Sequence, residues 1–206
     1  MTDYVLVGGG AFARELHDWF TPGFRATGDR FIGYLDDGDS PMRGTGHDLP
    51  QLGTIEGYTA VAGHNLVMAV SAPAAKQLLV AKLGASCFAR LIHPTAWVSA
   101  SARIGQGAII ALNTDISANA TVGDFATVNG YSSVGHDACL GDFATLSGYV
   151  DLTGYADIGR ATFVGSGACI LPKVKLGASC TIGAGSVVVR SVGDGVTVYA
   201  APARRL

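Results

Sequence analysis

The sequence predicts a small α/β domain with a parallel sheet over residues 1–91, followed by a parallel β-helix of hexapeptide repeats over residues 92–206. Two observations support this prediction. Segments with the patterns of strands and helices alternate along the first 91 residues, which is typical of a parallel sheet covered by helices. From Ile92 onward an aliphatic residue returns at every sixth position, which is typical of a solenoid.

The composition indicates an ordered globular protein. Of the 206 residues, 49% are hydrophobic and 15% are charged, so the chain can bury a sizeable core. Glycine is abundant, with 29 residues against seven prolines, which favours a tightly turning backbone over a disordered linker. The formal net charge of -2 gives no electrostatic reason to expect nucleic acid or an anionic membrane as a partner.

Signals for membrane insertion, export and metal binding are lacking in the sequence. No apolar run reaches the roughly 18 residues of a transmembrane helix, and the first strand-like run begins almost at Met1, which leaves no room for a signal peptide. The four cysteines, Cys87, Cys139, Cys169 and Cys180, form no CxxC pair and no cysteine–histidine cluster with metal spacing. We therefore expect a cytoplasmic protein without membrane insertion, disulfides or structural zinc.

Four short apolar runs in the first domain predict strands, and the stretches between them predict helices. The predicted strands are Tyr4–Val7, Phe31–Leu35, Leu66–Val70 and a run near Cys87–Leu91. One helix follows Gly10, and another begins at Pro73, because proline suits the first turn of a helix. Ligands of such sheets bind at the carboxyl ends of the strands, so we expect binding residues directly after them.

The turn after the first strand contains Gly8, Gly10 and Ala13 and resembles a shortened dinucleotide fingerprint, G-x-G-x-x-A, as in a Rossmann-like sheet. Backbone N–H groups at a helix start favour an anion, so the turn is either a phosphate or ribose site or only a tight turn. Asp36 and Asp37, at the second strand end, either form a solvated turn or accept a hydrogen bond from a nucleobase or ribose. Because 91 residues hold only a short sheet, half a nucleotide fits better than NAD.

The second domain repeats every six residues without one insertion. The aliphatic positions are Ile92, Val98, Ile104, Ile110, Ile116, Val122, Val128, Val134, Leu140, Leu146, Leu152, Ile158, Val164, Ile170, Leu176, Ile182 and Val188. A small or β-branched residue stands four positions after each, and glycine directly follows in half of the repeats. Three hexads form one triangular coil of 18 residues, so residue i stacks on residue i+18 at about 4.8 Å.

In such a coil the aliphatic side chains fill the interior, the small residues let the flat faces close, and the glycines are expected at corners that need a positive φ. Residues 92–187 supply sixteen hexads, a little over five coils. The remaining positions face outward, so any chemistry must lie on the outside of the prism. The tail from Ser191 to Leu206 is expected to cover one end.

Among the histidines, His136 stands apart because it takes an outward position in the middle of the coils and precedes a carboxylate, Asp137. A lone exposed histidine is usually inert, and His93, beside Pro94, is expected to be structural. The stacking rule, however, places Gly154 one coil after His136. A histidine base beside a backbone N–H of an adjacent coil is the geometry that acyl transfer requires.

These motifs resemble those of the bacterial nucleotide-sugar N-acetyltransferases of the PglD/NeuD type, and the resemblance covers essentially the whole chain. The motifs that carry it are Val7–Gly10, Ala13–Glu15, Gly33–Asp37, Leu91–Pro94, Asn129, Ser133–Asp137 and Ala201–Arg205. The resemblance implies a sugar-nucleotide-binding α/β domain joined to a left-handed β-helix that binds acetyl-CoA. It also implies that His136 is the catalytic base, that Asp137 supports it, and that the backbone amide of Gly154 lies near the thioester carbonyl.

The strand ends and the resemblance together give two further sets of candidate residues. The candidate substrate-binding residues are Gly8, Gly10, Ala11, Phe12, Asp36, Asp37, Ser71 and Asn129. The candidate acetyl-CoA-binding residues are Gly154, Gly165, Ser166, Gly183 and Ala184. Many relatives carry glutamate after the histidine and a histidine or glycine in the amide turn, where this chain has Asp137 and Ala11-Phe12, so the sugar and the base stay open.

The sequence therefore predicts an acetyl-CoA-dependent N-acetyltransferase acting on the amino group of a nucleotide-diphosphate-linked amino sugar. A 4-amino-4,6-dideoxy sugar is expected, for surface polysaccharide or glycan biosynthesis, and UDP, GDP and dTDP all fit. Two alternatives stay open: an O-acetyltransferase acting on a sugar or sialic acid hydroxyl, and a non-catalytic sugar-nucleotide-binding β-helix protein. A β-helix carbonic anhydrase needs three histidines on zinc, whereas residues 98–187 contain only His136, so no metal is expected.

The predicted assembly is a homotrimer with active sites between subunits, as the resemblance implies. Outward positions of the hexads are seldom charged, which predicts that large faces of the prism are buried against other copies. Examples are Ala126-Thr127, Ala144-Thr145 and Ala168-Cys169.

Overall fold

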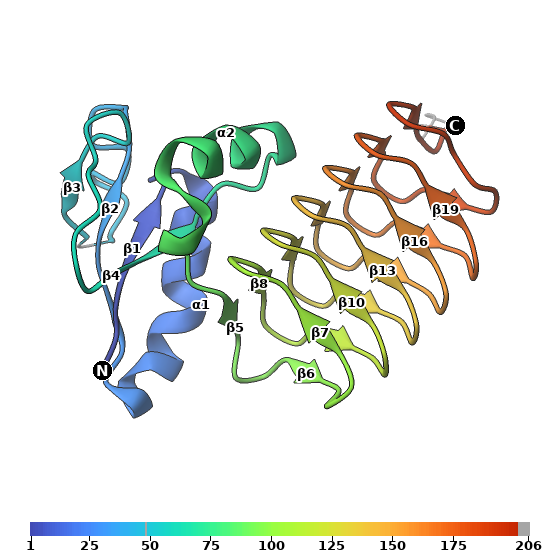
Figure 1. The fold of residues 1–206 in the computed structure, drawn as a ribbon, viewed down its shortest axis with the longest axis horizontal. Helices are drawn as coiled ribbons and strands as arrows, with labels where there is room; N and C mark the ends of the chain where they lie inside the picture. Colours follow the sequence, from blue (N-terminus) through green and yellow to red (C-terminus); the bar gives the residue numbers. More distant parts are fainter. Residues whose placement is uncertain (48, 202–206) are drawn as a thin grey trace, which may run out of the picture.

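The computed structural model describes residues 1–47 and 49–201. It contains an α/β domain followed by a solenoid of stacked coils that runs away from it (Figure 1). Strands β1–β4 form one parallel sheet, and strands β5–β22 form the three parallel sheets that are the faces of the solenoid. The predicted fold class, a small parallel α/β sheet followed by a parallel β-helix, is confirmed.

The sheet of the α/β domain has the strand order β3-β2-β1-β4. The elements are β1 (Asp3–Val7), α1 (Ala11–Thr27), β2 (Arg30–Leu35), β3 (Gln51–Gly53), β4 (His64–Met68), α2 (Pro73–Leu83) and a 3-10 helix, η1 (Ala85–Cys87). Helix α1 buries Ala13, Leu16 and Phe20, whose spacing places them on one side of the helix. It ends where Gly28 adopts a φ of 78° and donates its N–H to the carbonyl of Phe24 at 2.8 Å.

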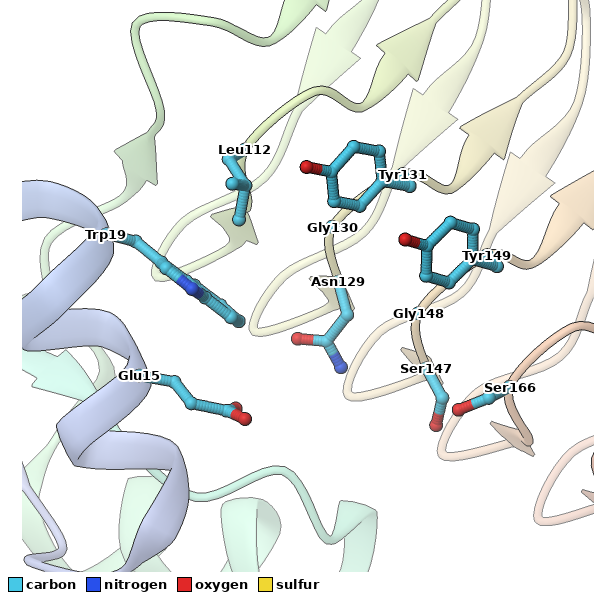
Figure 2. Close-up of a pocket in the computed structure, with 10 residues that line it drawn as sticks. All are labelled: Glu15, Trp19, Leu112, Asn129, Gly130, Tyr131, Ser147, Gly148, Tyr149 and Ser166. Atoms are coloured by element: carbon cyan, nitrogen blue, oxygen red, sulfur yellow. The ribbon is translucent and has the colours of Figure 1, made fainter.

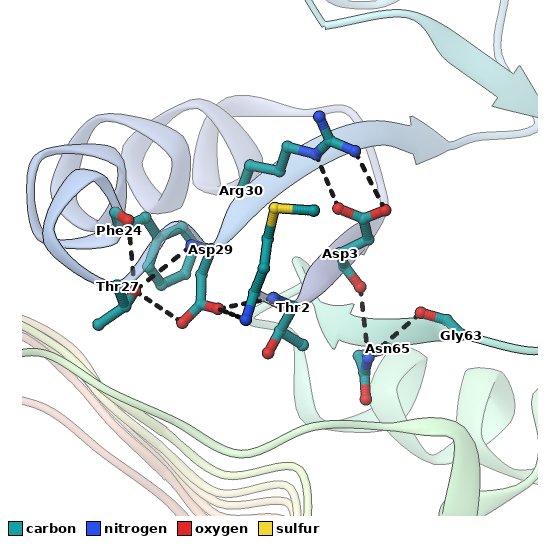
Figure 3. Close-up of polar contacts among 9 residues, drawn as sticks. Thr2, Asp3, Phe24, Thr27, Asp29, Arg30, Gly63 and Asn65 are labelled. Atoms are coloured by element: carbon teal, nitrogen blue, oxygen red, sulfur yellow. Dashed lines mark hydrogen bonds and ion pairs between the residues drawn. The ribbon is translucent and has the colours of Figure 1, made fainter.

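Polar contacts fix the amino-terminal edge of this sheet (Figure 3). Arg30 donates from Nε to Oδ1 of Asp3 at 2.7 Å, which links β2 to β1. Asn65 donates from Nδ2 to the carbonyl of Asp3 at 3.3 Å, which links β4 to β1. The backbone N–H of Thr2 donates to Oδ1 of Asp29 at 2.7 Å. These contacts all lie at the ends of the strands opposite to their carboxyl ends, where a ligand is expected.

Two details of the domain differ from the prediction. The predicted fourth strand near Cys87–Leu91 is wrong, because Cys87 ends η1, Phe88 forms only a single bridge to Leu66, and Leu91 begins the first strand of the solenoid. Phe88 is only 2% exposed and packs between the sheet and the solenoid. Its apolar side chain therefore serves the contact between the domains and does not mark a strand of the sheet. Strand β3 was not predicted, because three residues are too few to show an alternating pattern.

Each strand of the solenoid is two residues long, and consecutive strands pass around three faces. Face 1 contains β5 (Leu91–Ile92), β8 (Ile109–Ile110), β11 (Thr127–Val128), β14 (Thr145–Leu146), β17 (Phe163–Val164), β20 (Thr181–Ile182) and β22 (Thr197–Val198). Face 2 contains β6 (Trp97–Val98), β9 (Asp115–Ile116), β12 (Ser133–Val134), β15 (Asp151–Leu152), β18 (Cys169–Ile170) and β21 (Val187–Val188). Face 3 contains β7 (Arg103–Ile104), β10 (Thr121–Val122), β13 (Cys139–Leu140), β16 (Asp157–Ile158) and β19 (Lys175–Leu176).

The turns between the faces stack into three corners, which we name after one residue of each. The Asn129 corner, after face 1, comprises residues 111–114, 129–132, 147–150, 165–168 and 183–186. The His136 corner, after face 2, comprises residues 99–102, 117–120, 135–138, 153–156 and 171–174. The Phe143 corner, after face 3, comprises residues 105–108, 123–126, 141–144, 159–162 and 177–180.

The register of the strands has the predicted period of 18 residues. Ser133 pairs with Asp151, and Val134 pairs with Leu152. The aliphatic residues of the repeat are the second residues of the strands, and those from 110 to 188 are at most 5% exposed. Burial of each such side chain stabilises the fold by about 1.5–3 kcal/mol. Ile92 is 41% exposed, because no coil precedes it.

The predicted role of the glycines that follow the aliphatic residues is wrong. Positive φ occurs two positions later and mostly at larger residues, such as Tyr131 at 62° and Asp137 at 58°. The glycines instead allow one coil to cross the next closely. A Cβ on Gly135, for example, would lie 2.7 Å from the backbone nitrogen of Gly154. Steric exclusion between coils therefore explains the glycine pattern.

The outward positions chosen for contact with other copies also need correction. Ala126, Ala144 and Ala168 are buried inside the prism, because the fourth position after each aliphatic residue points inward. Thr127 and Thr145 do point outward, but the first domain of the same chain covers them. These residues therefore carry no argument for a trimer.

The first domain is fastened to face 1 and to the Phe143 corner. Lys76 of α2 is fully buried and donates from Nζ to the carbonyl of Phe125 at 2.9 Å, to Oγ1 of Thr127 at 3.0 Å and to the carbonyl of Ala144 at 3.1 Å. Burial lowers the pKa of Lys76 to about 7. The ring of Phe125 stacks on that of Phe143 at 5.2 Å in the same contact region. This junction sets the position of the first domain relative to the coils.

The far end of the solenoid is covered by the tail of the chain. Val192 forms a bridge with Leu176, β22 pairs with β20, and Val192 and Val198 pack against the core of the prism. Residues 202–206, which include most of the motif Ala201–Arg205, lie outside the described residues. Within residues 1–47 and 49–201, no helix has the length and apolarity needed to cross a membrane.

Candidate active site

Two pockets, of about 410 and 400 Å³, contain predicted site residues. The one of about 400 Å³ lies at the carboxyl ends of β1, β2 and β4, and we call it the strand-end pocket. Its lining residues are Gly8, Gly10, Ala11, Phe12, Asp36, Ala69, Val70, Ser71 and Ala72. Six residues predicted from the sequence to bind substrate are thus brought together. Asp37 is not among them.

The two aspartates after β2 have different surroundings. Asp36 accepts the backbone N–H of Gly9 on Oδ2 and that of Gly38 on Oδ1, both at 2.7 Å, so its carboxylate fixes the glycine turn. Asp37 accepts the backbone N–H of Glu56 on Oδ1 at 2.9 Å, which turns it away from the strand-end pocket. Asp36 keeps lone pairs for a ligand, because each carboxylate oxygen accepts more than one hydrogen bond.

The other pocket, of about 410 Å³, lies between α1 and the Asn129 corner, and we call it the corner pocket (Figure 2). Its lining residues are Glu15, Trp19, Leu112, Asn129, Gly130, Tyr131, Ser147, Gly148, Tyr149 and Ser166. The tyrosine rings stack in parallel, with centroids 5.0 Å apart. In Figure 2 the Glu15 carboxylate extends from α1 toward the Asn129 side chain. Asn129 and Ser166, both predicted site residues, therefore share this pocket.

The residues predicted to contact pantetheine continue along the same corner. Gly165, Ser166, Gly183 and Ala184 all belong to the Asn129 corner, one or two coils beyond the tyrosines. In these later coils, glycines 167 and 185 occupy the places that Tyr131 and Tyr149 take earlier, and an added Cβ would meet no atom within 4 Å at either glycine. The Asn129 corner therefore carries no side chain at these two positions, which leaves room for an extended ligand.

His136 and Asp137 form a hydrogen-bonded pair on the His136 corner. Nδ1 of His136 lies 3.0 Å from Oδ2 of Asp137, and Nδ2 of Asn119 donates to Oδ1 of Asp137 at 3.1 Å. The hydrogen bond with His136, followed by that from Asn119, lowers the pKa of Asp137 below its ordinary value. The ring of Tyr155 meets the imidazole edge to face, with centroids 5.1 Å apart. Nε2 of His136 is left as the nitrogen available for a substrate.

Gly154 is required beside that nitrogen. A Cβ at this position would lie 2.5 Å from Nε2 of His136, so any side chain would displace the imidazole. At the equivalent position of the Phe143 corner, the N–H of Gln106 is occupied by Asp124 of the next coil, at 2.8 Å. The residue one coil after Gly154 is Pro172, which offers no such acceptor. Among the described residues, the N–H of Gly154 donates no hydrogen bond, so a donor remains near the histidine.

The structure divides the predicted site residues between two corners. The catalytic group, His136 with Asp137 and Gly154, lies on the His136 corner, whereas Asn129 and the predicted pantetheine contacts lie on the Asn129 corner. Hydrogen bonds from the first domain to the solenoid, within the part of the chain that the structure describes, reach face 1, the turn that follows β5, face 3 at Ile104 and the Phe143 corner, but not the His136 corner. His136 accordingly lines neither the strand-end pocket nor the corner pocket of its own chain.

Sequence reasoning missed several residues around these sites. Glu15 and Trp19 face the corner pocket at helical spacing, but their sequence pattern is that of an ordinary surface helix. Asn119 could have been found, because it stands 18 residues before Asp137. A further group consists of His17, Asp18 and His47, whose possible ligand atoms lie within 4.8 Å of one another. These three are joined by hydrogen bonds of 3.1–3.3 Å, and their separation in sequence hid the cluster.

Comparisons with known proteins agree with this architecture. The family described as bacterial transferase hexapeptide (six repeats) matches residues 155–190. The acetyltransferase domain of PglB from Neisseria gonorrhoeae is 29% identical over 100% of both chains, with a TM-score of 0.86. PerB from Caulobacter crescentus, solved with CoA and GDP-perosamine, is 29% identical over 99% of this chain and 97% of that chain, with a TM-score of 0.82. WeeI from Acinetobacter baumannii is 25% identical over 100% of both chains, with a TM-score of 0.83. Among curated protein sequences, none matches this chain.

The fold and these similarities define the class of the protein, an acetyltransferase built on hexapeptide repeats. The resemblance to the bacterial nucleotide-sugar N-acetyltransferases is confirmed by PglB and PerB, which are similar over essentially the whole length of this chain. Acetyl-CoA, the co-substrate predicted from the sequence, is the molecule bound in a structure of the PglB domain.

Proposed function

We propose that this protein transfers the acetyl group of acetyl-CoA to the amino group of a nucleotide-diphosphate-linked amino sugar, with His136 as general base. The observation that carries the proposal is the group of His136, Asp137 and Gly154, in which a half-exposed imidazole packs against Gly154 of the next coil, whose backbone N–H has no acceptor among the described residues. The likeness to PerB, a GDP-perosamine N-acetyltransferase, supports the substrate class.

The chemistry follows from the atoms at this corner. The amine nitrogen attacks the carbonyl carbon of the thioester while Nε2 of His136 takes a proton from it. The N–H of Gly154 stabilises the oxyanion of the tetrahedral intermediate, which is worth about 10²–10³-fold in rate. The carbon–sulfur bond then breaks, and the proton passes to the departing thiolate of CoA. Asp137 holds the imidazole through Nδ1, so that Nε2 accepts the proton.

The two domains divide the binding of the substrates in this proposal. Residues 1–91 hold the nucleotide, with its diphosphate on the turn at Gly10, Ala11 and Phe12 and with Asp36 on the base or ribose. Residues 92–206 hold acetyl-CoA, whose pantetheine lies along the bare Asn129 corner at Gly165–Ser166 and Gly183–Ala184. Asp37, which faces Glu56, is assigned only an indirect part through the turn after β2.

A homotrimer would bring the separated groups together. If the Asn129 corner of one chain faces the His136 corner of the next, each active site takes its nucleotide pocket from one chain and its histidine from another. Exposed aromatic side chains at both corners, Tyr131 and Tyr149 on one and Tyr155 on the other, support such a contact. We place the reaction in the cytoplasm, where acetyl-CoA is available, and assign it to the synthesis of a surface polysaccharide or glycan.

The test is a direct assay of acetyl transfer. The protein is incubated with acetyl-CoA and UDP-, GDP- and dTDP-linked 4-amino-4,6-dideoxy sugars, and free CoA thiol and product mass are measured. One nucleotide sugar is expected to release thiol and gain one acetyl group on nitrogen. His136→Ala should keep the fold, because the side chain lies outside the prism, and should lower turnover by at least about 100-fold. Thiol release only with hydroxy sugars or sialic acid would favour O-acetylation, and no release with any of them would contradict an enzyme.

A further inference from the structure

The charge carried by the residues that line the corner pocket is negative. Glu15 supplies a carboxylate, and no lysine, arginine or histidine is among the residues that line the pocket. The other polar groups are the amide of Asn129 and the hydroxyls of serines and tyrosines, which accept hydrogen bonds as readily as they donate them. A pocket with one negative charge and no positive charge disfavours a phosphate. It favours a ligand group that is cationic or rich in hydrogen-bond donors.

Asn129 contributes to the lining of the corner pocket a side-chain oxygen that has no hydrogen-bond partner. Its Oδ1 is shielded from solvent and accepts no hydrogen bond from any residue within 1–47 and 49–201. Polar side-chain atoms removed from water normally have a partner, so this amide lacks a donor that a ligand can supply. Rotation about the last side-chain bond exchanges the oxygen and nitrogen ends, so the acceptor can be turned toward the ligand.

The corner pocket also continues the strand-end pocket along α1. Ala11 and Phe12 line the strand-end pocket at the start of the helix, and Glu15 lines the corner pocket one turn later. Four residues of helix advance by about 6 Å. A sugar attached to a diphosphate at the helix start is therefore within reach of Glu15. Trp19, one further turn along, places an aromatic ring beside the carboxylate (Figure 2), and such rings attract cations.

We infer that Glu15 and Asn129 form an amine-recognition subsite, which binds the sugar amino group as an ammonium and selects amino sugars over their hydroxy counterparts. An ammonium has three N–H donors. One is received by Glu15 and one by Asn129, and the third proton is lost to solvent through Nε2 of His136 from a neighbouring chain, which leaves the neutral amine. That amine then attacks the thioester while His136 takes the second proton and passes it to the thiolate of CoA, as in the proposed mechanism. This inference rests on the proposed function and deepens it, because it assigns the choice between N- and O-acetylation to two named residues.

The experiment compares the binding of matched ligands by calorimetry. The ligands are the nucleotide 4-amino-4,6-dideoxy sugar that is bound best among the UDP, GDP and dTDP forms and its 4-hydroxy counterpart with the same nucleotide. The wild-type protein is expected to bind the amino ligand at least about tenfold more tightly, as fits a charge-assisted hydrogen bond. Glu15→Gln should weaken the amino ligand by about tenfold and leave the hydroxy ligand unchanged, so that the preference disappears.

A matched control removes the same charge elsewhere. Glu56 pairs with Lys82 on the surface and lines neither pocket, so Glu56→Gln should keep the full preference for the amino ligand. Asn129→Leu, which keeps a similar volume without an acceptor, should also reduce the preference. Equal binding of both ligands by the wild type, or an equal loss for both in Glu15→Gln, would overturn the subsite while leaving the acetyltransferase intact. If none of the nucleotide sugars binds, the proposed function fails and the inference fails with it.

Discussion

Replacing Gly154 by alanine is expected to slow catalysis by about 100-fold without unfolding the protein. The added Cβ would lie 2.5 Å from Nε2 of His136 and 2.8 Å from its Cε1. Ordinary contact between such atoms needs roughly 1 Å more, so the imidazole has to move by about that distance. The backbone itself accepts alanine, because Gly154 is not among the residues with positive φ.

The expected loss of rate follows from this displacement. Moving the imidazole shifts Nε2 away from the amine and disturbs the 3.0 Å contact between Nδ1 and Asp137. A misplacement of about 1 Å costs about 100-fold in rate, which corresponds to about 2.7 kcal/mol. The free energy of unfolding should change by less than about 1 kcal/mol, because the side chain of His136 is 59% exposed and can rotate into solvent.

The assay measures kcat for acetyl transfer at saturating substrates, together with the midpoint of thermal unfolding. Gly193→Ala is the control, because an added Cβ there would meet no atom within 4 Å and the φ of Gly193 is not positive. This control should keep both values. A kcat of Gly154→Ala within about threefold of the wild type, which is about 0.7 kcal/mol, would refute the assigned position of the base. A large fall in the unfolding midpoint would show that the loss comes from the fold instead.

Two further predictions concern the rest of the molecule. Asp36→Ala should weaken the sugar nucleotide by about 1–3 kcal/mol and leave acetyl-CoA almost unchanged, as measured by calorimetric titration of each ligand; an equal loss for both would contradict the division between domains. Burial lowers the pKa of Lys76 from 10.5 to about 7, so unfolding takes up a proton between these pH values and stability rises with pH across them, by up to about 1.4 kcal/mol per unit. Urea unfolding at pH 7, 8.5 and 10 should show this rise in the wild type but not in Lys76→Met.

The solenoid was predictable because its period is a direct consequence of its geometry. An aliphatic residue at every sixth position specifies the interior, and the pairing of Val134 with Leu152 follows from three hexads in each coil. The role of Gly135 was not predictable in the same way, because a glycine that avoids a clash and one that adopts positive φ look alike in a sequence. The run near Cys87–Leu91 was misread for a related reason, since apolar residues buried at a domain junction resemble a strand.

The candidate site was only partly predictable. The stacking rule found the neighbours within one corner, Gly154 beside His136, because 18 residues separate them. It could not show that Asn129 lies on a different corner from His136. Only seven residues separate them in sequence, but one hexad of chain leads from each corner of the prism to the next. Glu15 was missed because its partner surface belongs to the other domain, and the packing between domains leaves no periodic trace in the sequence.

The separation of the two corners leads to one last prediction, on active sites shared between chains. The strand-end and corner pockets lie beside α1 and the Asn129 corner, whereas His136 lies on its own corner, which the first domain of the same chain does not reach through any hydrogen bond among the described residues. In a symmetric trimer with sites between chains, a chain with His136→Ala still offers an intact nucleotide pocket. A chain with Asp36→Ala still offers an intact base.

Mixing these two variants should therefore restore activity that neither has alone. After unfolding and refolding together in equal amounts, about a quarter of the sites should combine an intact pocket with an intact base. The rate is measured at a sugar-nucleotide concentration far below the Kd of Asp36→Ala, so that this variant alone contributes little. The control mixes the two variants without unfolding, which leaves the original oligomers in place. Activity equal to the average of the separate variants, in a refolded mixture shown by mass to contain mixed trimers, would mean that each chain completes its own site.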